Sequence, residues 1–339
     1  MFQLKSKARI ILFMIALICI FLFFSYQLPY YIHKPGHADP LNPVVAVEGG
    51  FESEGDMHLV TIQGGKATPF QYLMALMRDY YDILPIENVL PEGMSDQEYR
   101  QMQLMMMEDS QESSKVVAYE AANQEIEIEY EGVYVVSVVE DMPAEGILQP
   151  EDEIIEIDQQ KINEANDLID YVTAKQAGDT IELTILRDNE TLEKEVTLQA
   201  LEQLEGKPGI GISLVTNRSV SVSPELQFSS GDIGGPSAGL MFSLEIYDQL
   251  TEQDMTKGHQ IAGTGEVDYQ GNVGRIGGVD KKVVAADRAG CDIFFAPYEN
   301  GRSGSNYEVA KQVAKDIGTD MKIVPVDHFD EAVEYLENL

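Results

Sequence analysis

Residues 235–239 read Gly-Pro-Ser-Ala-Gly, a sequence that favours a sharp turn into a helix. Proline fits the first helical position, because its missing N–H would have no partner there, and the glycine before it allows a tight turn. Residues 240–250 then carry apolar side chains at helical spacing. Ser237 is therefore predicted on the first turn of a helix, where free N–H groups and the helix dipole can hold an oxyanion. The turn alone fits the plain start of a core helix equally well.

Two adjacent lysines begin a second predicted helix, over residues 280–289, after a glycine pair. The positions three, four and seven beyond Lys282 are small and apolar: Ala285, Ala286 and Ala289. The same offsets from Lys281 end at Arg288. Because side chains at those offsets share one face of a helix, Lys282 is predicted to be buried. We interpret Lys281 as a solvated neighbour whose positive charge helps to lower the pKa of Lys282.

A buried lysine can act as a base toward a serine hydroxyl. It must be neutral to do so, which requires its pKa to fall several units below about 10.4 through desolvation. Neutral Lys282 would take the proton of Ser237 as the hydroxyl attacks a peptide carbonyl, and would return it to the leaving amine.

The surroundings of these two residues resemble the proteolytic domain of Lon proteases. The resemblance rests on the Gly-Pro-Ser-Ala-Gly turn and on Thr264-Gly265-Glu266, Gly271, Gly277-Gly278, Lys282, Ala285-Ala286 and Gly290. It implies a Ser–Lys peptidase in which Ser237 is the nucleophile, Lys282 is the base and Thr264 orients the lysine. A plain role at the end of a strand is an equal alternative for Thr264.

Some residues near the nucleophile support the resemblance and one departs from it. Gly235, Pro236 and Ala238 would support the turn. Lon proteases commonly carry an aspartate at the position of Gly234, whereas the nearest aspartate here is Asp232, to which we assign only a supporting role. The sequence contains no Gly-x-x-x-x-Gly-Lys-[Ser/Thr] nucleotide site. We therefore expect ATP-independent cleavage of short or loosely structured substrates.

Residues 121–202 resemble a bacterial PDZ domain, because their strand-like and helical stretches follow the order of that family. The family usually has Gly-Asp where this chain has Glu151-Asp152. The resemblance implies that the C-terminus or an extended segment of a partner adds as a strand. The edge expected to receive it consists of Gly132, Val133, Tyr134 and Val135. A structural sandwich of strands without a ligand is the alternative.

An apolar run from Ile10 to Phe24 follows three basic residues, Lys5, Lys7 and Arg9. The run is short for a hydrocarbon core of about 30 Å, but the tyrosines that follow it are typical of a membrane interface. We expect an uncleaved single-pass anchor in the cell membrane, with the N-terminus in the cytoplasm and the catalytic domain extracytoplasmic. A cleaved signal peptide is the alternative, although no small-x-small site follows at the right distance.

The charge of the chain limits its partners. The formal net charge is −35, from 23 basic and 58 acidic side chains, which argues against nucleic acid as a partner. Cys19 and Cys291 suggest neither a disulfide framework nor a zinc site, and no histidine stands in a catalytic pattern. We expect no cofactor, metal or nucleotide. The resemblance to Lon leaves a homo-oligomer open.

The sequence thus predicts an α+β fold in four parts. Residues 1–32 are the cytoplasmic tip and transmembrane anchor, 33–120 a membrane-proximal strand and helical segment, 121–202 the PDZ-like module, and 203–339 the Lon-type proteolytic domain. The predicted function is a membrane-anchored, ATP-independent serine endopeptidase that cleaves extracytoplasmic peptides or small regulatory proteins, with the PDZ module selecting the substrate. The alternative is a catalytically inactive PDZ tether that only binds a partner.

Overall fold

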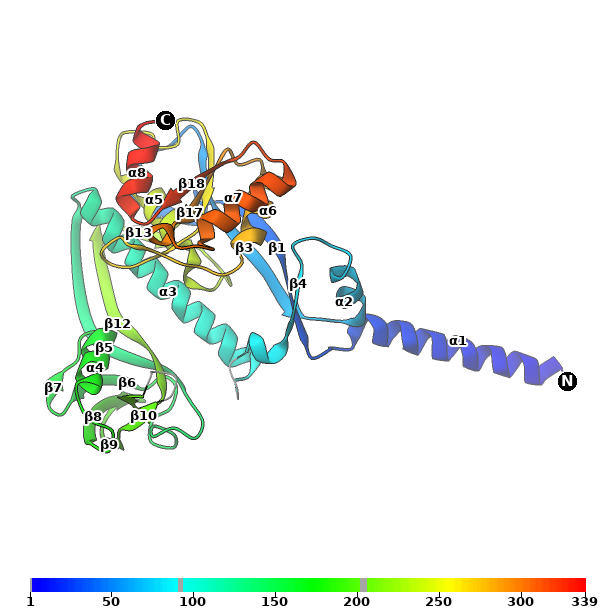
Figure 1. Ribbon diagram of the computed structural model, residues 1–339, viewed down its shortest axis with the longest axis horizontal. Coiled ribbons are helices and arrows are strands. Elements are labelled where there is room, and N and C mark those ends of the chain that lie inside the picture. The colour runs from blue at the N-terminus through cyan, green and yellow to red at the C-terminus, as the bar shows by residue number, and fades with distance from the viewer. Residues whose placement is uncertain (1, 91–93, 202–205) are drawn as a thin grey trace.

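The computed structural model describes residues 2–90, 94–201 and 206–339, which form two lobes and a projecting N-terminal helix (Figure 1). The larger lobe is built on a six-stranded sheet in the order β18-β17-β14-β3-β1-β4. Neighbouring strands from β18 to β3 are parallel, whereas β1 is antiparallel to β3 and β4. The strands are β1 Tyr30–Pro40, β3 Asp56–Lys66, β4 Asp82–Pro85, β14 Gln260–Gly263, β17 Ile293–Pro297 and β18 Lys322–Val326.

Helices cover both faces of this sheet. Along β17, Ile293 and Phe295 belong to the core shared with α3, α5 and α8, while Phe294 and Ala296 belong to the core shared with α6 and α7. The pleat causes this alternation, because successive side chains of a strand point to opposite faces. The sheet therefore separates α5, which follows Ser237, from α6, which carries Lys282. The helices are α3 Asp96–Ala121, α5 Gly239–Leu250, α6 Val279–Ala289, α7 Asn306–Ile317 and α8 Phe329–Glu337.

The larger lobe is a mixed α/β fold, so the α+β class expected from the sequence is wrong. Helix α6 connects β14 to β17, and α7 connects β17 to β18, and both pairs of strands are parallel. Such crossovers interleave helices with the strands of one sheet, whereas an α+β domain keeps the two kinds of element apart.

The smaller lobe contains a second sheet in the order β12-β5-β6-β8-β9, with β7 beside β6. Its core joins the sheet to α4 through buried apolar side chains such as Val135, Ile154 and Leu168. β5 and β12 pair along their whole lengths, and this long ribbon connects the two lobes (Figure 1). The elements are β5 Glu125–Val138, β6 Glu153–Ile157, β7 Gln160–Lys161, α4 Ala165–Thr173, β8 Thr180–Arg187, β9 Glu190–Thr197 and β12 Ile212–Ser223.

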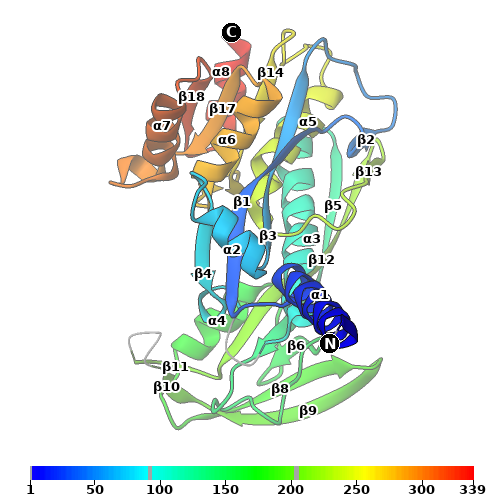
Figure 2. The same cartoon turned by 90° about the vertical axis from the view of Figure 1, so that its right-hand side faces the viewer.

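The smaller lobe is inserted between two parts of the larger lobe. Residues 30–66 supply β1 and β3 to the larger sheet before the chain crosses through α3 into β5. The chain then returns through β12 to the turn that carries Ser237. Figure 2 shows α3 (cyan) running beside the β5–β12 ribbon into the larger lobe. The shorter elements are β2 Val45–Val47, α2 Pro69–Ala75, η1 Ile86–Asn88, β10 Gln199–Leu201, β11 Lys207–Gly209, β13 Leu226–Phe228, η3 Pro236–Ala238, β15 Glu266–Val267, β16 Val273–Gly274 and η4 Glu299–Gly301.

The N-terminal helix α1, Phe2–Ser25, projects from the body of the molecule (Figure 1). Phe24 near its C-terminal end packs on Phe70 of α2, with ring centroids 5.0 Å apart. No helix in the described ranges is long and apolar enough to cross a membrane, so the predicted transmembrane helix and the single-pass cell-membrane localisation are wrong. The apolar run Ile10–Phe24 has the length of about 22 Å as a helix, which is less than the hydrocarbon core of about 30 Å.

Glu245 is a buried carboxylic acid in the middle of α5. Its side chain is only 1% exposed and accepts a hydrogen bond of 2.7 Å from Gln249 Nε2. Burial raises the pKa of Glu245 from 4.5 to about 7. The unfolded chain therefore releases this proton at a lower pH than the folded chain does. The folded state loses stability as the pH rises from about 4.5 to about 7.

We expect Glu245→Gln to raise the melting temperature more at pH 8 than at pH 5. Glutamine keeps the size of the side chain and can still pair with Gln249, but it has no charge to desolvate. Thermal unfolding of the full chain, followed by circular dichroism at both pH values, measures the difference. Glu252→Gln, which alters an exposed residue just beyond α5, is the control and leaves both temperatures unchanged. An equal effect of Glu245→Gln at the two pH values would contradict the raised pKa.

Candidate active site

Ser237 lies in the 3₁₀ turn η3, which runs directly into α5. Gly235 leads into this turn with a φ of +92°, a conformation that L side chains rarely adopt. The N–H of Gly235 donates to the carbonyl of Gln103 over 2.7 Å. Ala238 is buried and Ser237 is half-buried. The turn thus fixes its flanking residues and leaves the serine hydroxyl accessible.

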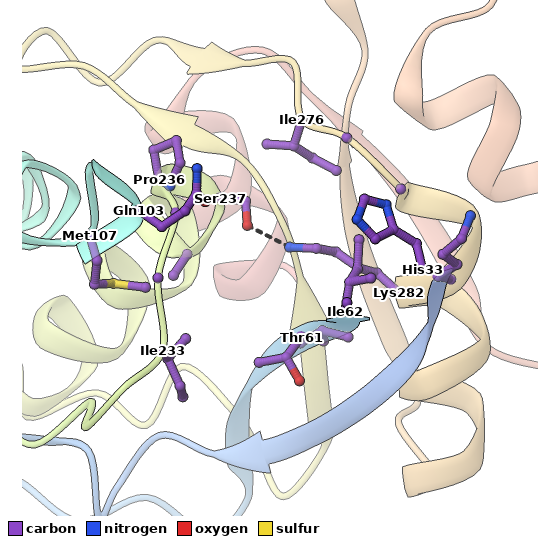
Figure 3. Close-up of a pocket in the computed structure, with 18 of the residues that line it drawn as sticks. His33, Thr61, Ile62, Gln103, Met107, Ile233, Pro236, Ser237, Ile276 and Lys282 are labelled. Carbon is purple, nitrogen blue, oxygen red and sulfur yellow. Dashed lines mark hydrogen bonds between the residues drawn. The ribbon is translucent and has the colours of Figure 1, made fainter. Parts of the chain in front are cut away.

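Ser237, Lys282 and Thr264 are each in hydrogen-bond contact with the other two. Lys282 Nζ lies 2.6 Å from Ser237 Oγ (Figure 3) and donates to Thr264 Oγ1 over 3.0 Å. Thr264 Oγ1 in turn donates to the carbonyl oxygen of Ser237 over 3.0 Å. One N–H of the lysine is therefore directed to the threonine, which leaves the nitrogen lone pair of a neutral lysine free to face the serine hydroxyl.

Burial sets the protonation state of Lys282. Its side chain is 3% exposed, and desolvation lowers its pKa from 10.5 to about 7. The groups that its Nζ contacts are the neutral hydroxyls of Ser237 and Thr264. No carboxylate therefore stabilises its charge directly. The lysine is neutral in a large fraction of molecules near neutral pH, which is the state a base needs.

Helix α6 brings Lys282 to this position by packing closely on β3. Gly278, just before the helix, has a φ of +68°, and a Cβ on it would lie 2.2 Å from Ile62 Cδ1. The backbone conformation favours glycine at this position, and a side chain there would also have to displace the end of the Ile62 side chain. Ala285 and Ala286 pack in the core between α6 and the sheet, as the predicted face requires, whereas Ala289 is exposed.

Lys281 is buried, so the expectation of a solvated neighbour is wrong. Its side chain is 2% exposed, and its Nζ contacts the carboxylate of Asp82 on β4 and that of Asp280, the latter at 2.8 Å. These carboxylates compensate its charge, and the lowered pKa of Lys282 results from burial. The prediction failed because it considered only the face of α6, whereas Asp82 comes from a distant part of the chain.

A cavity of about 830 Å³ opens beside Ser237 and Lys282 (Figure 3). One wall consists of β3 from Leu59 to Gly64, and the opposite wall consists of residues 232–236. Side chains from four other segments complete the lining: His33, Asp82, Gln103, Met107 and Ile276. Asp232, for which we predicted a supporting role, lines the cavity but makes no hydrogen bond to the serine or the lysine among the described contacts.

The backbone N–H groups at the start of α5 are partly occupied. Pro236 has none, the N–H of Gly239 donates to the carbonyl of Pro236, and that of Leu240 donates to the carbonyl of Gly265 over 3.1 Å. The expectation that the helix start as a whole holds an oxyanion therefore narrows to the N–H groups of Ser237 and Ala238. The N–H of Ser237 itself is the candidate donor next to the nucleophile.

Helix α3 contacts the nucleophile turn, which the sequence analysis did not identify. Ser110 Oγ donates to the carbonyl of Pro236, and Ser114 Oγ donates to that of Gly239, each over 3.0 Å. Both serines are buried. A signal was present, because serines at 110, 113 and 114 follow helical spacing in a stretch rich in methionine.

The smaller lobe does not offer the free edge predicted at Gly132, Val133, Tyr134 and Val135. β12 pairs with β5 at all four of these positions, and β6 pairs with β5 from the other side at Val133 and Tyr134. The prediction treated the first strand of the module as its edge. It did not include β12, which follows the module in the sequence and covers that edge.

An apolar groove lies between α4 and the beginning of β12. Its volume is about 110 Å³, and its lining includes Leu168, Ile169, Val172, Ile210, Gly211, Ile212 and Leu214. β12 is the end strand of its sheet, so its outer side is the available edge of this lobe. The groove thus combines an apolar helix face with a strand edge, the combination that binds an extended peptide in strand addition.

Comparison with known protein families finds a match in each lobe. Residues 105–198 match the model of the PDZ domain, and residues 228–337 match that of the Lon protease (S16) C-terminal proteolytic domain. The chain is 36% identical over 102 residues to a Lon protease of Metamycoplasma arthritidis, which covers 30% of this chain and 11% of the relative. It is also 36% identical over 105 residues to a Lon protease of Buchnera aphidicola, which covers 31% and 12%. The chain thus spans about a tenth of the length of these relatives.

Solved structures similar to this chain include two PDZ domains. That of an SdrC-like protein from Listeria innocua is 43% identical, with a TM-score of 0.24, and the match covers 24% of this chain and 92% of that chain. The PDZ domain of an SdrC-like protein from Listeria monocytogenes is 37% identical, with a TM-score of 0.25, and the match covers 26% and 93%.

We expect Lys282→Met to raise the stability of the folded chain by a few kcal/mol below pH 7. The cost of burying the lysine is largest there, because the folded state must either hold a desolvated charge or give up the proton. The unfolded chain binds more protons than the folded chain between about pH 7 and pH 10.5, so the gain shrinks as the pH rises through this range. Urea unfolding at pH 6 and pH 9 measures both values. A gain that is equal at the two pH values would contradict the lowered pKa.

Proposed function

We propose that this chain, a PDZ plus Lon-type (S16) serine peptidase by its domains, is an endopeptidase that cleaves peptides and loosely structured proteins without a nucleotide. The observation that carries the proposal is the contact of 2.6 Å between Ser237 Oγ and a buried Lys282 whose pKa is about 7. The absence of a phosphate-binding loop from the sequence supports independence from ATP.

The geometry supports an acyl-enzyme mechanism. Neutral Lys282 takes the proton of Ser237 as the hydroxyl attacks the carbonyl carbon of the scissile bond. The N–H of Ser237 holds the resulting oxyanion, and Thr264 keeps the lysine aligned through the bond to its Nζ. The protonated lysine then gives its proton to the leaving amine, and water hydrolyses the acyl-enzyme. We expect the rate to rise with pH around 7, as Lys282 loses its proton.

An extended peptide would lie along β3. β14 pairs with β3 only at Asp56–Leu59, whereas β1 covers the other side of β3 as far as Lys66. No strand among the described residues pairs with the remaining edge, and this edge forms one wall of the cavity beside Ser237. Seven residues of edge, 60–66, extend over about 23 Å. A bound segment must be unfolded to pair there, which supports peptides and flexible regions as substrates.

The groove beside α4 would hold a second part of the substrate or its C-terminus. Its lining is apolar, and the strand edge of β12 provides backbone hydrogen-bonding groups. We therefore assign the selection of substrates to the smaller lobe, called the PDZ lobe from here on, and the cleavage to the larger lobe. The two sites are joined by one continuous strand, because β12 continues from the groove into the ribbon that joins the lobes.

The test uses the purified full chain and a complex mixture of unfolded peptides with known sequences. Mass spectrometry identifies the new N-termini that wild type produces without ATP. We expect Ser237→Ala and Lys282→Ala each to reduce these products at least 1,000-fold, because either change removes the nucleophile or its base. Circular dichroism verifies that both variants fold. Full activity in either variant would refute the Ser–Lys mechanism. Binding of peptides by wild type without any cleavage would instead indicate an inactive tether.

A further inference from the structure

Helix α3 holds the nucleophile turn on both sides of Ser237. The carbonyl of Gln103 accepts from the N–H of Gly235 over 2.7 Å. Ser110 Oγ donates to the carbonyl of Pro236 over 3.0 Å. Ser114 Oγ lies 3.0 Å from the carbonyl oxygen of Gly239 and 2.6 Å from that of Ser110, so its proton is shared between the turn and α3. The helix thus fixes the backbone before the nucleophile and the backbone after it, although it contributes no side chain to the reaction itself.

These contacts lie in a dry and closely packed interface. Ser110 and Ser114 are 3% and 0% exposed, so an unpaired carbonyl there would have no water to replace its partner. A Cβ on Gly239 would lie 3.1 Å from Ser110 Oγ, which shows how closely α3 approaches the turn. On the other side, the N–H of Gly265 donates to the carbonyl of Ser237 over 3.1 Å. The turn is therefore held between α3 and residues 264–265.

We infer that Ser110 and Ser114 are positioning residues for the proposed peptidase reaction, and this inference rests on that function. Proton transfer to Lys282 requires the serine hydroxyl to remain within hydrogen-bond reach, and a small displacement of a reacting group costs much of the rate. Removal of either hydroxyl breaks a hydrogen bond that ties α3 to the turn and allows the turn to shift, although the carbonyls of Pro236 and Gly239 still accept from the N–H of Gly239 and from Ser243 Oγ. Substrate binding along β3 does not involve either serine.

Ser113 provides a matched control on the same helix. It is also 3% exposed, but its hydroxyl donates to the carbonyl of Asp109 within α3 and does not reach the turn. We expect Ser110→Ala and Ser114→Ala to lower kcat about 10- to 100-fold with KM changed less than threefold, and Ser113→Ala to leave both near wild type. The pH midpoint should stay near that of wild type in all three variants, because burial of Lys282 is unchanged.

The rate at which a fluorophosphonate labels Ser237 gives a second measurement that does not depend on peptide binding. It should fall in parallel with kcat in Ser110→Ala and Ser114→Ala. Equal kcat and equal labelling in Ser110→Ala, Ser114→Ala and Ser113→Ala would overturn the positioning role while leaving the peptidase function intact. A wild-type chain that is neither labelled nor active would instead refute the proposed function itself.

A separate observation connects the smaller lobe to the same helix. Arg218 of β12 is 10% exposed, and its Nη2 lies 2.7 Å from Oδ1 of Asp109, the residue before Ser110. Its guanidinium also lies 3.3 Å from the centroid of the Tyr269 ring, in the loop between β15 and β16. Arg218 therefore touches both structures that hold the nucleophile turn, α3 and the segment that follows Gly265.

The contacts of Arg218 are incompletely satisfied. Its Nε and the hydroxyl of Tyr269 are buried and have no hydrogen-bond partner among the described residues. Burial also lowers the pKa of Arg218 and raises that of Asp109, although the two are paired. Rearrangement of such a junction breaks fewer hydrogen bonds than rearrangement of a fully paired one would, which suits a coupling between two sites.

We also propose that Arg218 couples the PDZ groove to the reaction, so that a peptide bound in the groove raises kcat at Ser237. The groove wall at Ile212–Leu214 and Arg218 lie on one strand, about 13 Å apart. A peptide that adds to the outer edge of β12 orders this strand through new backbone hydrogen bonds. The ordered strand holds Arg218 against Asp109 and Tyr269, and thereby holds α3 against the turn.

The smaller lobe contains a matched control for Arg218. Lys175 forms the same kind of group, with its Nζ 3.0 Å from Asp158 and 4.7 Å from the centroid of the Tyr171 ring, but within the PDZ lobe and away from α3. Lys175→Met and Arg218→Met thus remove the same kind of charge and ring contact. If Arg218→Met does not fold, the double variant Arg218→Met/Asp109→Asn takes its place, because it leaves no unpaired carboxylate at position 109.

The experiment uses the full chain, an internally quenched substrate with an amidated C-terminus, and a fluorescein-labelled hexapeptide that ends in valine with a free carboxylate. Fluorescence anisotropy measures binding of the hexapeptide. We expect the hexapeptide to raise kcat at least threefold in wild type and Lys175→Met, and less than 1.5-fold in Arg218→Met, with unchanged binding. Activation retained in Arg218→Met, or binding to wild type without activation, would overturn the coupling. Failure of the hexapeptide to bind would overturn the assignment of an apolar C-terminus to the groove.

Discussion

The active site depends on the burial of Lys282, whose Nζ meets no carboxylate among the residues that the structure describes. Lys282 is useful as a base only because the protein withholds water and carboxylates from it, and its pKa of about 7 is the consequence. Dense packing must therefore surround it, and the sheet, α5 and α6 provide that packing from both faces. The same environment is costly for stability, as expected for a residue retained for chemistry rather than for folding.

Lys281 and Lys282 are adjacent in the sequence, but the groups that surround their Nζ atoms differ. Lys281 and Lys282 are both almost fully buried, yet Lys281 is paired with Asp82 and Asp280, while Lys282 contacts only hydroxyl groups. The pairing of Lys281 with Asp82 ties α6 to β4. The lack of a carboxylate beside Lys282 favours the neutral amine. Burial alone is therefore not sufficient for a lysine to act as a base. The buried lysine must also lack a neighbouring carboxylate that stabilises its charged form.

Local patterns were sufficient to predict the parts of the site that lie within one helix or turn. The Gly-Pro-Ser turn and the alanines after Lys282, together with the resemblance to Lon proteases, indicated the two residues that the structure places 2.6 Å apart. Partners from distant segments were beyond such reasoning. Asp82, Ser110 and β12 reach their positions only through tertiary packing, so the state of Lys281, the support of the turn and the covering of the β5 edge could not be derived. The apolar run Ile10–Phe24 likewise led to a wrong prediction, because no helix in the described ranges is long and apolar enough to cross a membrane.

The position of the inserted lobe explains why its influence on the site can be direct. The chain enters this lobe from α3 and leaves it through β12, and both elements contact each other as well as the larger lobe. α3 holds the backbone around Ser237, and β12 carries Arg218 to α3. An insertion at a distant loop would have to act through many intervening elements. Here one of the two chain crossings between the lobes, α3, holds the nucleophile turn directly, and the other, β12, contacts α3 through Arg218, so the coupling that we propose between the PDZ lobe and Ser237 has a short route.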